Sequence, residues 1–306
     1  MRIAVIDLGT NTFNLLLAKI NPDHTFTTLY SGKLPAKIGE GGINQHLITA
    51  LAMNRAINVL KNYTIIIEAE GGADRIIGIA TSAVRTADNR NDFIAAIKEQ
   101  TGIEVTVISG DEEAAYIFEG VKQAIDIGNE TTITLDIGGG SNELIIADGQ
   151  QIYWKHSFPL GIARVLDMFK PENPILPPTL EKVENYFWMQ LEPFWIEAAK
   201  YSVKTLIGSS GSFDTYRSLL TQGNPGDALS FDIPLNDYFE LHRRLADSTI
   251  EQRMQMKGME TMRAEMIVLA SIFTNIVIQK LGIKRFIQSE YSLKEGFMKS
   301  IINHIQ

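Results

Sequence analysis

Two short runs that join an aspartate to a glycine have the residue types needed to handle phosphate. Asp7 and Gly9 frame the first run, and Asp136 and Gly138 frame the second, 129 residues further on (136 − 7 = 129). A glycine lets the backbone approach a ligand closely, and successive backbone N–H groups in a turn can form an anion-binding concavity. Because the aspartates would repel phosphate, we expect a divalent cation or an ordered water between them; Mg²⁺ prefers one or two carboxylates with waters and phosphate oxygens.

Each run taken alone is also typical of an ordinary turn, since Asp and Gly are common turn residues. Two copies, each after an apolar strand and each followed by hydroxyl-bearing residues, favour a pair of loops that face a ligand across a cleft between domains. The chain has no Gly-x-x-x-x-Gly-Lys-Ser/Thr phosphate loop and no Gly-x-Gly-x-x-Gly before a helix. Gly138, Gly139 and Gly140 lead into a predicted strand, which disfavours a dinucleotide-binding fold.

A predicted helix begins with three consecutive acids. Ser109 and Glu112 have the Ser-x-x-Glu spacing of a capping box, and acids in the first turn suit the helix dipole. Capping explains Glu113 less well, because Ile117 and Gly120 follow it at i+4 and i+7 on the apolar side of the helix. Glu113 is therefore either a satisfied structural acid or a general base for water, since burial raises the pKa of a carboxyl group toward a useful value.

Two arginines could bind phosphate oxygens through both arms of the guanidinium. Arg85 is the first candidate, with an ion pair to Asp88 or Glu113 as the structural alternative. Arg263 is the weaker candidate, because acids at positions 260 and 265 are plausible structural partners.

The elements that must position these side chains follow an α/β pattern. Apolar runs, turn residues and helical spacing predict the order β-β-β-α-β-α-β-α. The predicted strands comprise residues 3–6, 13–20, 25–30, 75–79, 104–108, 133–136, 143–147, 151–156, 205–207 and 285–287. The main predicted helices comprise residues 109–124, a long apolar helix ending near 281, and a last helix from 293.

The second half of the chain restarts the pattern of the first. Residues 75–82 recur as residues 205–212 at an offset of 130 (208 − 78 = 130), close to the offset between the two Asp runs. Two matched pairs indicate a duplicated domain, although apolar-Gly-Ser strings are common enough for coincidence. We expect a first domain at residues 1–126 and a second at 127–306 with helical insertions.

Composition narrows the classes of function. The chain has 306 residues, no cysteine and a formal net charge of −8, which excludes disulfides, thiolate zinc sites and a Cys nucleophile. An acidic protein is poorly suited to bind nucleic acid polymers. The most apolar stretch, residues 266–278, falls short of the about 20 residues that a membrane span needs. We expect a cytoplasmic protein without nucleic acid or membrane partners, and a homodimer as the default oligomer.

Six motifs in order resemble the exopolyphosphatase and guanosine-pentaphosphate phosphohydrolase (Ppx/GppA) family, of the actin, hexokinase and heat-shock ATPase superfamily. They comprise residues 7–12, 80–89, 108–114, 136–143, 159–164 and 263–267. The resemblance is to the short, two-domain form. It implies two ribonuclease-H-like α/β domains related by duplication, with an interdomain cleft. It also implies Mg²⁺-assisted hydrolysis of the terminal phosphoanhydride bond of inorganic polyphosphate or guanosine pentaphosphate.

The resemblance also assigns roles to residues. It makes Glu113 the catalytic base, in agreement with its place on the helix. It places Asp136 and Glu143 near the divalent metal, where Asp7 from the first run is a third candidate. The expected substrate-binding residues are Thr10, Asn11, Thr12, Arg85, Gly138, Gly139, Gly140, Ser141, Asn142 and Arg263.

Departures from the family pattern leave the substrate open. Ser210 stands where the family usually has glycine, and Lys294 where it usually has arginine. A side chain at Ser210 either crowds a ligand or adds a hydroxyl to it. Other functions that fit the same superfamily are an acceptor-dependent kinase or ATPase, a non-catalytic nucleotide sensor and an actin-like assembly protein.

Overall fold

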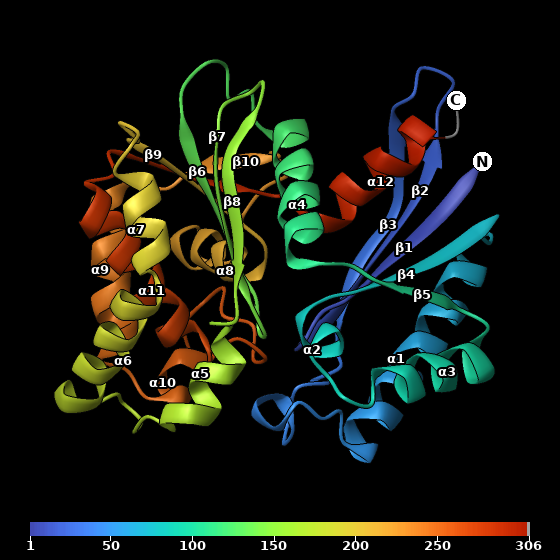
Figure 1. The fold of residues 1–306 in the computed structure, drawn as a ribbon, viewed down its shortest axis with the longest axis horizontal. Coiled ribbons are helices and arrows are strands. Elements are labelled where there is room, and N and C mark those ends of the chain that lie inside the picture. Colours follow the sequence, from blue (N-terminus) through green and yellow to red (C-terminus); the bar gives the residue numbers. More distant parts are fainter. Residues whose placement is uncertain (305–306) are drawn as a thin grey trace. The chain divides into compact units, whose positions relative to one another are not determined.

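The computed structural model describes residues 1–304, which form two compact units (Figure 1). The first unit comprises Met1–Gly120 together with the segment from Ser292, and the second comprises Val121–Tyr291. The sequence pattern had put the whole segment after residue 126 in one domain. The units differ from that expectation because the last helix, α12 (Leu293–His304), packs against the first two strands of the chain and buries Met298 and Ile302.

The first unit contains a five-stranded sheet with the order β3-β2-β1-β4-β5. The first three strands form an antiparallel meander, and the last two run parallel to β1. The strands are β1 (Arg2–Leu8), β2 (Thr12–Ile20), β3 (Phe26–Pro35), β4 (Arg75–Ala80) and β5 (Glu104–Val107). Both faces of β1 are buried, as its continuous apolar run predicted.

Helices cover both faces of this sheet. Ala4 and Ile6 of β1 belong to one core cluster with α1 (Ala50–Ala69) and α3 (Arg90–Thr101). Ile3 and Val5 lie on the opposite face of the strand, and α12 packs on that side (Figure 1). The unit is completed by the short helices η1 (Ile43–Gln45) and α2 (Ser82–Arg85) and the first turns of α4 (Gly110–Ala124).

The second unit repeats this topology in a six-stranded sheet with the order β10-β11-β9-β6-β7-β8. β6, β7 and β8 form the antiparallel meander, and β9 and β11 run parallel to β6. Its strands are β6 (Thr132–Ile137), β7 (Asn142–Ala147), β8 (Ile152–Phe158), β9 (Thr205–Ser209), β10 (Ser230–Asp232) and β11 (Arg285–Ser289). The shared strand order confirms the duplication and the predicted α/β fold class.

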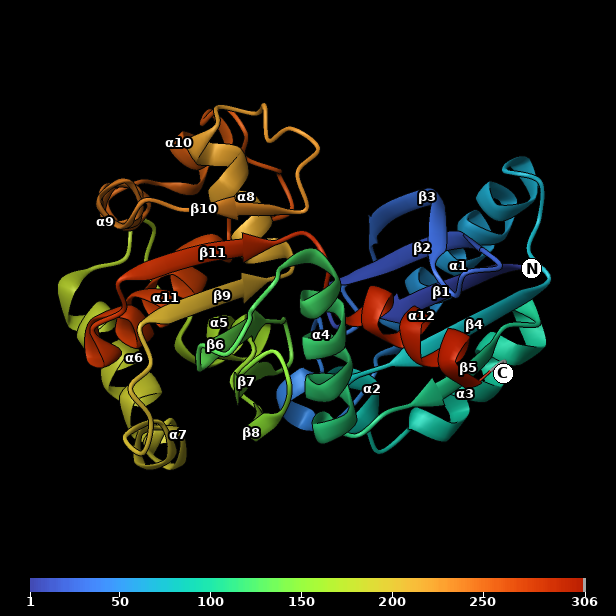
Figure 2. The same cartoon turned by 90° about the horizontal axis from the view of Figure 1, so that it is seen from above.

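Seven helices are described in the second unit (Figure 2), and many of them contribute buried side chains to a hydrophobic core that is rich in aromatic residues. In this core the rings of Phe187 and Phe273 pack edge to face, with their centroids 4.9 Å apart. The helices are α5 (Ile162–Phe169), α6 (Pro177–Gln190), α7 (Glu192–Ala198), α8 (Gly211–Leu220), α9 (Leu235–Ala246), α10 (Ile250–Met254) and α11 (Ile267–Leu281). Within residues 1–304, no helix is long and apolar enough to cross a membrane.

The topology brings the predicted site residues to one edge of each sheet. β1 and β4 are parallel neighbours in the first unit, as β6 and β9 are in the second. The carboxyl ends of parallel neighbours lie at the same edge, where ligands of open α/β sheets bind. The Asp-x-Gly turns follow β1 and β6 at this edge. The expected cleft between the domains stays a prediction.

Candidate active site

The acids of the second unit form a cross-strand pair. Asp136 on β6 lies directly opposite Glu143 on the antiparallel strand β7. Side chains at opposite positions project from the same face, with Cβ atoms about 5 Å apart. Both side chains are nearly inaccessible, with exposed fractions of 7% and 1%. The strand register therefore places two carboxylates side by side at the end of the sheet.

The first unit contains the same arrangement with one residue changed. Asp7 lies opposite Asn14 across β1 and β2, and the amide nitrogen of Asn14 donates a hydrogen bond to Asp7, at 2.8 Å. The duplication thus aligns Asp7 with Asp136 and Asn14 with Glu143. Because an amide replaces the second acid, the first unit offers a cation one carboxylate where the second unit offers two.

Serine hydroxyls orient the carboxylates of the second unit. Asp136 accepts hydrogen bonds from Ser209 Oγ at 2.9 Å and from Ser210 Oγ at 2.7 Å, one on each carboxylate oxygen. Glu143 accepts one from Ser157 Oγ at 2.6 Å. Neither Ser157 nor Ser209 was predicted to have a role, although the repeat of residues 75–82 includes the segment that holds Ser209.

The glycine turn after β6 leaves backbone donors free for a ligand. The N–H of Gly138 bonds the carbonyl of Ser141 at 3.0 Å and closes the turn. Among residues 1–304, no group accepts a hydrogen bond from the N–H of Gly139, Gly140 or Ser141. Asn142, at the start of β7, donates from its side chain to the carbonyl of Leu160 at 2.9 Å. The turn thus has the open donors that the sequence predicted for an anion-binding concavity.

The carbonyl groups of the same turn accept hydrogen bonds from residues at the start of α5. Gly138 and Gly139 accept hydrogen bonds from the N–H groups of Ile162 and Ala163, both at 2.9 Å. Gly140 accepts one from Nε of the buried Arg164 at 2.8 Å. Arg164 had appeared in a family motif without a role, and the structure shows that it fixes the glycine turn.

Gly161 has no Cβ, and this allows the start of α5 to approach the glycine turn closely. A Cβ on residue 161 would lie 2.3 Å from backbone atoms of Gly140. We predict that Gly161→Ala destabilises the second unit by about 3 kcal/mol, since backbone cannot yield as a side chain can. Thermal unfolding measures the loss. Gly128→Ala is the matched control, because a Cβ on residue 128 would meet nothing within 4 Å. Its free energy of unfolding should fall only because alanine disfavours the positive φ of 60° at this position, by about 1 kcal/mol. Equal melting temperatures for the two variants would contradict the prediction.

The first Asp-x-Gly turn is built in the same way. A Cβ on Gly9 would lie 2.8 Å from the carbonyl oxygen of Thr12, as one on Gly138 would lie 2.6 Å from that of Ser141. The carbonyl of Asn11 accepts two hydrogen bonds, both at 2.9 Å, from the backbone segment that follows β3. Thr10 is buried, and its carbonyl accepts one more bond from the same segment. In both loops of the duplicated pair, therefore, the glycine leaves no room for a Cβ and the carbonyls of the turn accept hydrogen bonds from a later segment of the chain.

Glu113 is buried and paired with an arginine. Its exposed fraction is 6%, and its Oε2 lies 2.8 Å from Nη1 of Arg85. The same Nη1 donates to the carbonyl of Ile108 at 3.1 Å. The structural alternative for Arg85, an ion pair with Glu113, is thus present; a contact between Arg85 and phosphate stays a prediction.

The capping box at the start of α4 is confirmed. Glu112 Oε2 accepts from the backbone N–H of Ser109 at 2.7 Å, and Ser109 Oγ accepts from the backbone N–H of Glu112 at 3.2 Å. The two adjacent glutamates therefore have different environments. Glu112 completes the helix cap, which leaves the inward Glu113 as the candidate for chemistry.

Arg263 lies against the start of α8. A Cβ on Gly211, the first residue of that helix, would come within 1.8 Å of Nη2 of Arg263, so a side chain at residue 211 would displace the guanidinium. Ser210 precedes Gly211 and bonds Asp136. Arg263 is thus adjacent to the turn that orients Asp136, and its expected contact with phosphate stays a prediction.

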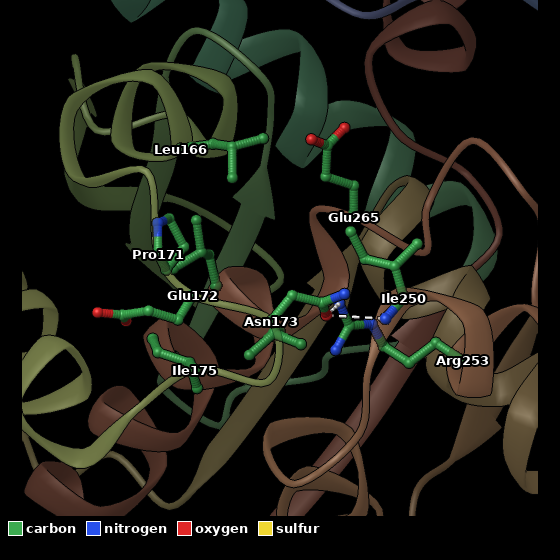
Figure 3. Close-up of a pocket in the computed structure, with 10 residues that line it drawn as sticks. Leu166, Pro171, Glu172, Asn173, Ile175, Ile250, Arg253 and Glu265 are labelled. Atoms are coloured by element: carbon green, nitrogen blue, oxygen red, sulfur yellow. Dashed lines mark hydrogen bonds between the residues drawn. The ribbon is translucent and has the colours of Figure 1, made fainter.

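One pocket of the second unit has a volume of about 60 Å³ and is lined by other residues (Figure 3). The carboxamide oxygen of Asn173 accepts hydrogen bonds there from the N–H of Ile250 at 2.8 Å and from Arg253 at 3.3 Å. Arg253 also donates to three backbone carbonyls, and burial lowers the pKa of its guanidinium. No predicted site residue lines this pocket, in which Arg253 of α10 holds the backbone at Leu245, Ser248 and Ala264.

No group of three or more His, Cys, Asp or Glu side chains within residues 1–304 is arranged to hold a metal ion without further ligands. Two adjacent carboxylates with neighbouring backbone donors nevertheless suit Mg²⁺, which keeps waters and takes phosphate oxygens as its other ligands. Asp136 and Glu143 fit that requirement. Asp7 belongs to the other unit, so its place in the same metal set stays a prediction.

The repeated sheets and their acid-bearing turns define a ribonuclease-H-like α/β protein of two duplicated units. Residues 16–304 match the sequence model of the Ppx/GppA phosphatase family, and the chain belongs to this family. The match begins after the first Asp-x-Gly turn and includes Arg85, Glu113, Asp136, Glu143 and Arg263.

Individual relatives agree with the family match. The crystal structure of an exopolyphosphatase from Cytophaga hutchinsonii superposes with a TM-score of 0.95 at 35% identity, covering 100% of this chain and 99% of that one. A Ppx/GppA family member from Aquifex aeolicus shares the fold with a TM-score of 0.81 at 22% identity, covering 100% and 99% of the two chains. Exopolyphosphatase 1 of Mycobacterium tuberculosis strain H37Rv is 26% identical over 97% of this chain and 87% of its own length.

These findings confirm the predicted family, the fold class and the assignment to phosphoanhydride hydrolases. The roles of individual residues and the identity of the metal stay predictions.

Proposed function

We propose that the protein is an exopolyphosphatase, which removes the terminal phosphate from inorganic polyphosphate by hydrolysis. The carrying observation is the pair Asp136 and Glu143 next to a turn in which the N–H groups of Gly139, Gly140 and Ser141 have no acceptor in the described chain. Such a combination suits a ligand that is all phosphate, because it binds oxygens and needs no pocket for a base or sugar. Relatives named as exopolyphosphatases support this choice of substrate.

In the proposed reaction, water attacks the terminal phosphorus in line with the anhydride oxygen. Glu113 accepts a proton from the water as the new P–O bond forms. The anhydride P–O bond breaks, and its oxygen leaves on the shortened polyphosphate while orthophosphate is released. Phosphoryl transfer depends mainly on positioning and electrostatics, which the free N–H groups of Gly139 and Gly140 would provide at the oxygens. Arg85 would orient the Glu113 carboxylate through the ion pair described above.

A Mg²⁺ ion held by Asp136 and Glu143 would neutralise charge on the phosphate oxygens. The serine hydroxyls on both carboxylates are compatible with this role, because ligating carboxylates are usually hydrogen-bonded themselves. The remaining expectations, a homodimer in the cytoplasm, are tested by light scattering and by cell fractionation.

The function is tested by phosphate release from purified protein with and without Mg²⁺. We expect release from polyphosphate without an added acceptor and a requirement for Mg²⁺. Guanosine pentaphosphate serves as the second substrate: faster release from it would assign the alternative hydrolase activity. Release only when a hydroxyl acceptor is present would identify a kinase and contradict the proposal. Binding without release from either substrate would identify a nucleotide or phosphate sensor.

A further inference from the structure

Ser210 has a backbone conformation that suits glycine. Its φ is 68° and its ψ is −177°, a region that is essentially restricted to glycine because a Cβ clashes there. The residue immediately precedes α8 and follows β9. A strained non-glycine residue persists only where its surroundings hold it and often marks a functional site. The side chain of Ser210 should therefore contribute something that glycine cannot.

The contribution visible in the structure is a hydrogen bond to Asp136. Ser210 Oγ donates to Oδ1 at 2.7 Å, while Ser209 Oγ donates to Oδ2 at 2.9 Å. With one hydroxyl on each oxygen, both the position and the plane of the carboxylate are defined. A carboxylate oxygen has two lone-pair directions, so a hydroxyl donor does not by itself prevent the same oxygen from binding a cation. Glycine at position 210 would leave Oδ1 without this donor.

We propose that Ser210 is a positioning residue that holds Asp136 in the orientation for binding a divalent cation. The inference rests on the proposed function, in which Asp136 is a ligand of Mg²⁺. Residues that hydrogen-bond a metal ligand typically change metal affinity or activity by about 10–100-fold when they are removed. Ser210 thus gives this chain a cation site that depends on a hydroxyl group from a strained backbone position.

The test compares Ser210→Gly with Ser210→Ala. Both variants lack the hydroxyl, so both should bind Mg²⁺ at least about tenfold more weakly than the wild type. They differ in the Cβ, so the Gly variant should melt about 2 °C above the Ala variant. Mg²⁺ affinity is measured without substrate, from the rise in melting temperature with Mg²⁺ concentration. The Mg²⁺ concentration that gives half-maximal phosphate release provides the second readout.

Ser218→Ala is the matched control. It removes a serine hydroxyl from α8, in the same unit, without a contact to Asp136, and should keep the wild-type response to Mg²⁺. The positioning role of Ser210 is wrong, and the proposed function still stands, if the wild type releases phosphate while Ser210→Gly binds Mg²⁺ within about twofold of the wild-type affinity. If the wild-type protein shows neither a response to Mg²⁺ nor phosphate release, the proposed function and the role of Ser210 both fail.

Discussion

Replacing Glu113 with glutamine should lower kcat for phosphate release by about 10²–10⁴-fold, the usual contribution of a general base. Glutamine has the same shape as glutamate, and its amide oxygen can still accept from Arg85, which lies 2.8 Å from the native carboxylate. The amide cannot accept a proton from water. Binding of polyphosphate should therefore change little, and the measurement is kcat and KM together with the affinity for polyphosphate by titration calorimetry.

Glu112→Gln is the matched control for this experiment, because it makes the same chemical change one residue earlier. Glu112 accepts from Ser109 in the capping box, and glutamine serves equally well at that position of a capping box. Activity of the control should stay within about twofold of the wild type. Glu113 is not the base if Glu113→Gln retains kcat within about tenfold of the wild type, because a general base contributes at least 10²-fold.

The second large effect concerns Asp136→Asn. The variant keeps the size of the side chain and removes its charge, so the pair with Glu143 would hold a cation with one carboxylate in place of two. Stabilisation of transition-state charge by a metal is worth several kcal/mol, so we expect a loss of about 10³-fold in kcat/KM at a fixed Mg²⁺ concentration. The Mg²⁺ concentration required for activity should rise as well, and a titration of rate against Mg²⁺ measures both.

Asp232→Asn provides the control for charge alone. Asp232 lies on β10 of the same sheet and pairs on the surface with Arg285 at 2.9 Å. Exposed ion pairs contribute about 0–1 kcal/mol, so this variant should match the wild type in activity and in Mg²⁺ requirement. An unchanged Mg²⁺ requirement in Asp136→Asn would show that the cation binds elsewhere.

Much of the fold could be predicted because several strands, β1, β6 and β9 among them, are buried along nearly their whole length. Continuous apolar runs marked β1, β4, β6 and β9 with small errors at their ends. β10 has three residues, too few for a periodic pattern, and the prediction missed it. The place of α12 could not be predicted either, because periodicity indicates which face of a helix is apolar but not which sheet that face will cover.

The site residues could be predicted only in part, for a related reason. The family resemblance selected Glu113 as the base, and its place on the apolar side of the helix predicted the buried environment that the structure shows. The hydroxyls that orient Asp136 were missed, because Ser209 lies beside Asp136 only through the parallel pairing of β6 with β9. This contact joins residues 73 positions apart, and strand register over such a distance cannot be deduced from spacing in one sequence.

The return of α12 to the first unit has a consequence for synthesis on the ribosome. β1 leaves the ribosome first, and the helix that packs on its Ile3 and Val5 face is made only after the whole of Val121–Tyr291. One face of the first sheet must therefore stay without its native cover while the second unit is translated. A nascent chain arrested before residue 292 should be more sensitive to protease in its N-terminal part than the finished protein. A chaperone could bind the apolar face of the first sheet that α12 later covers.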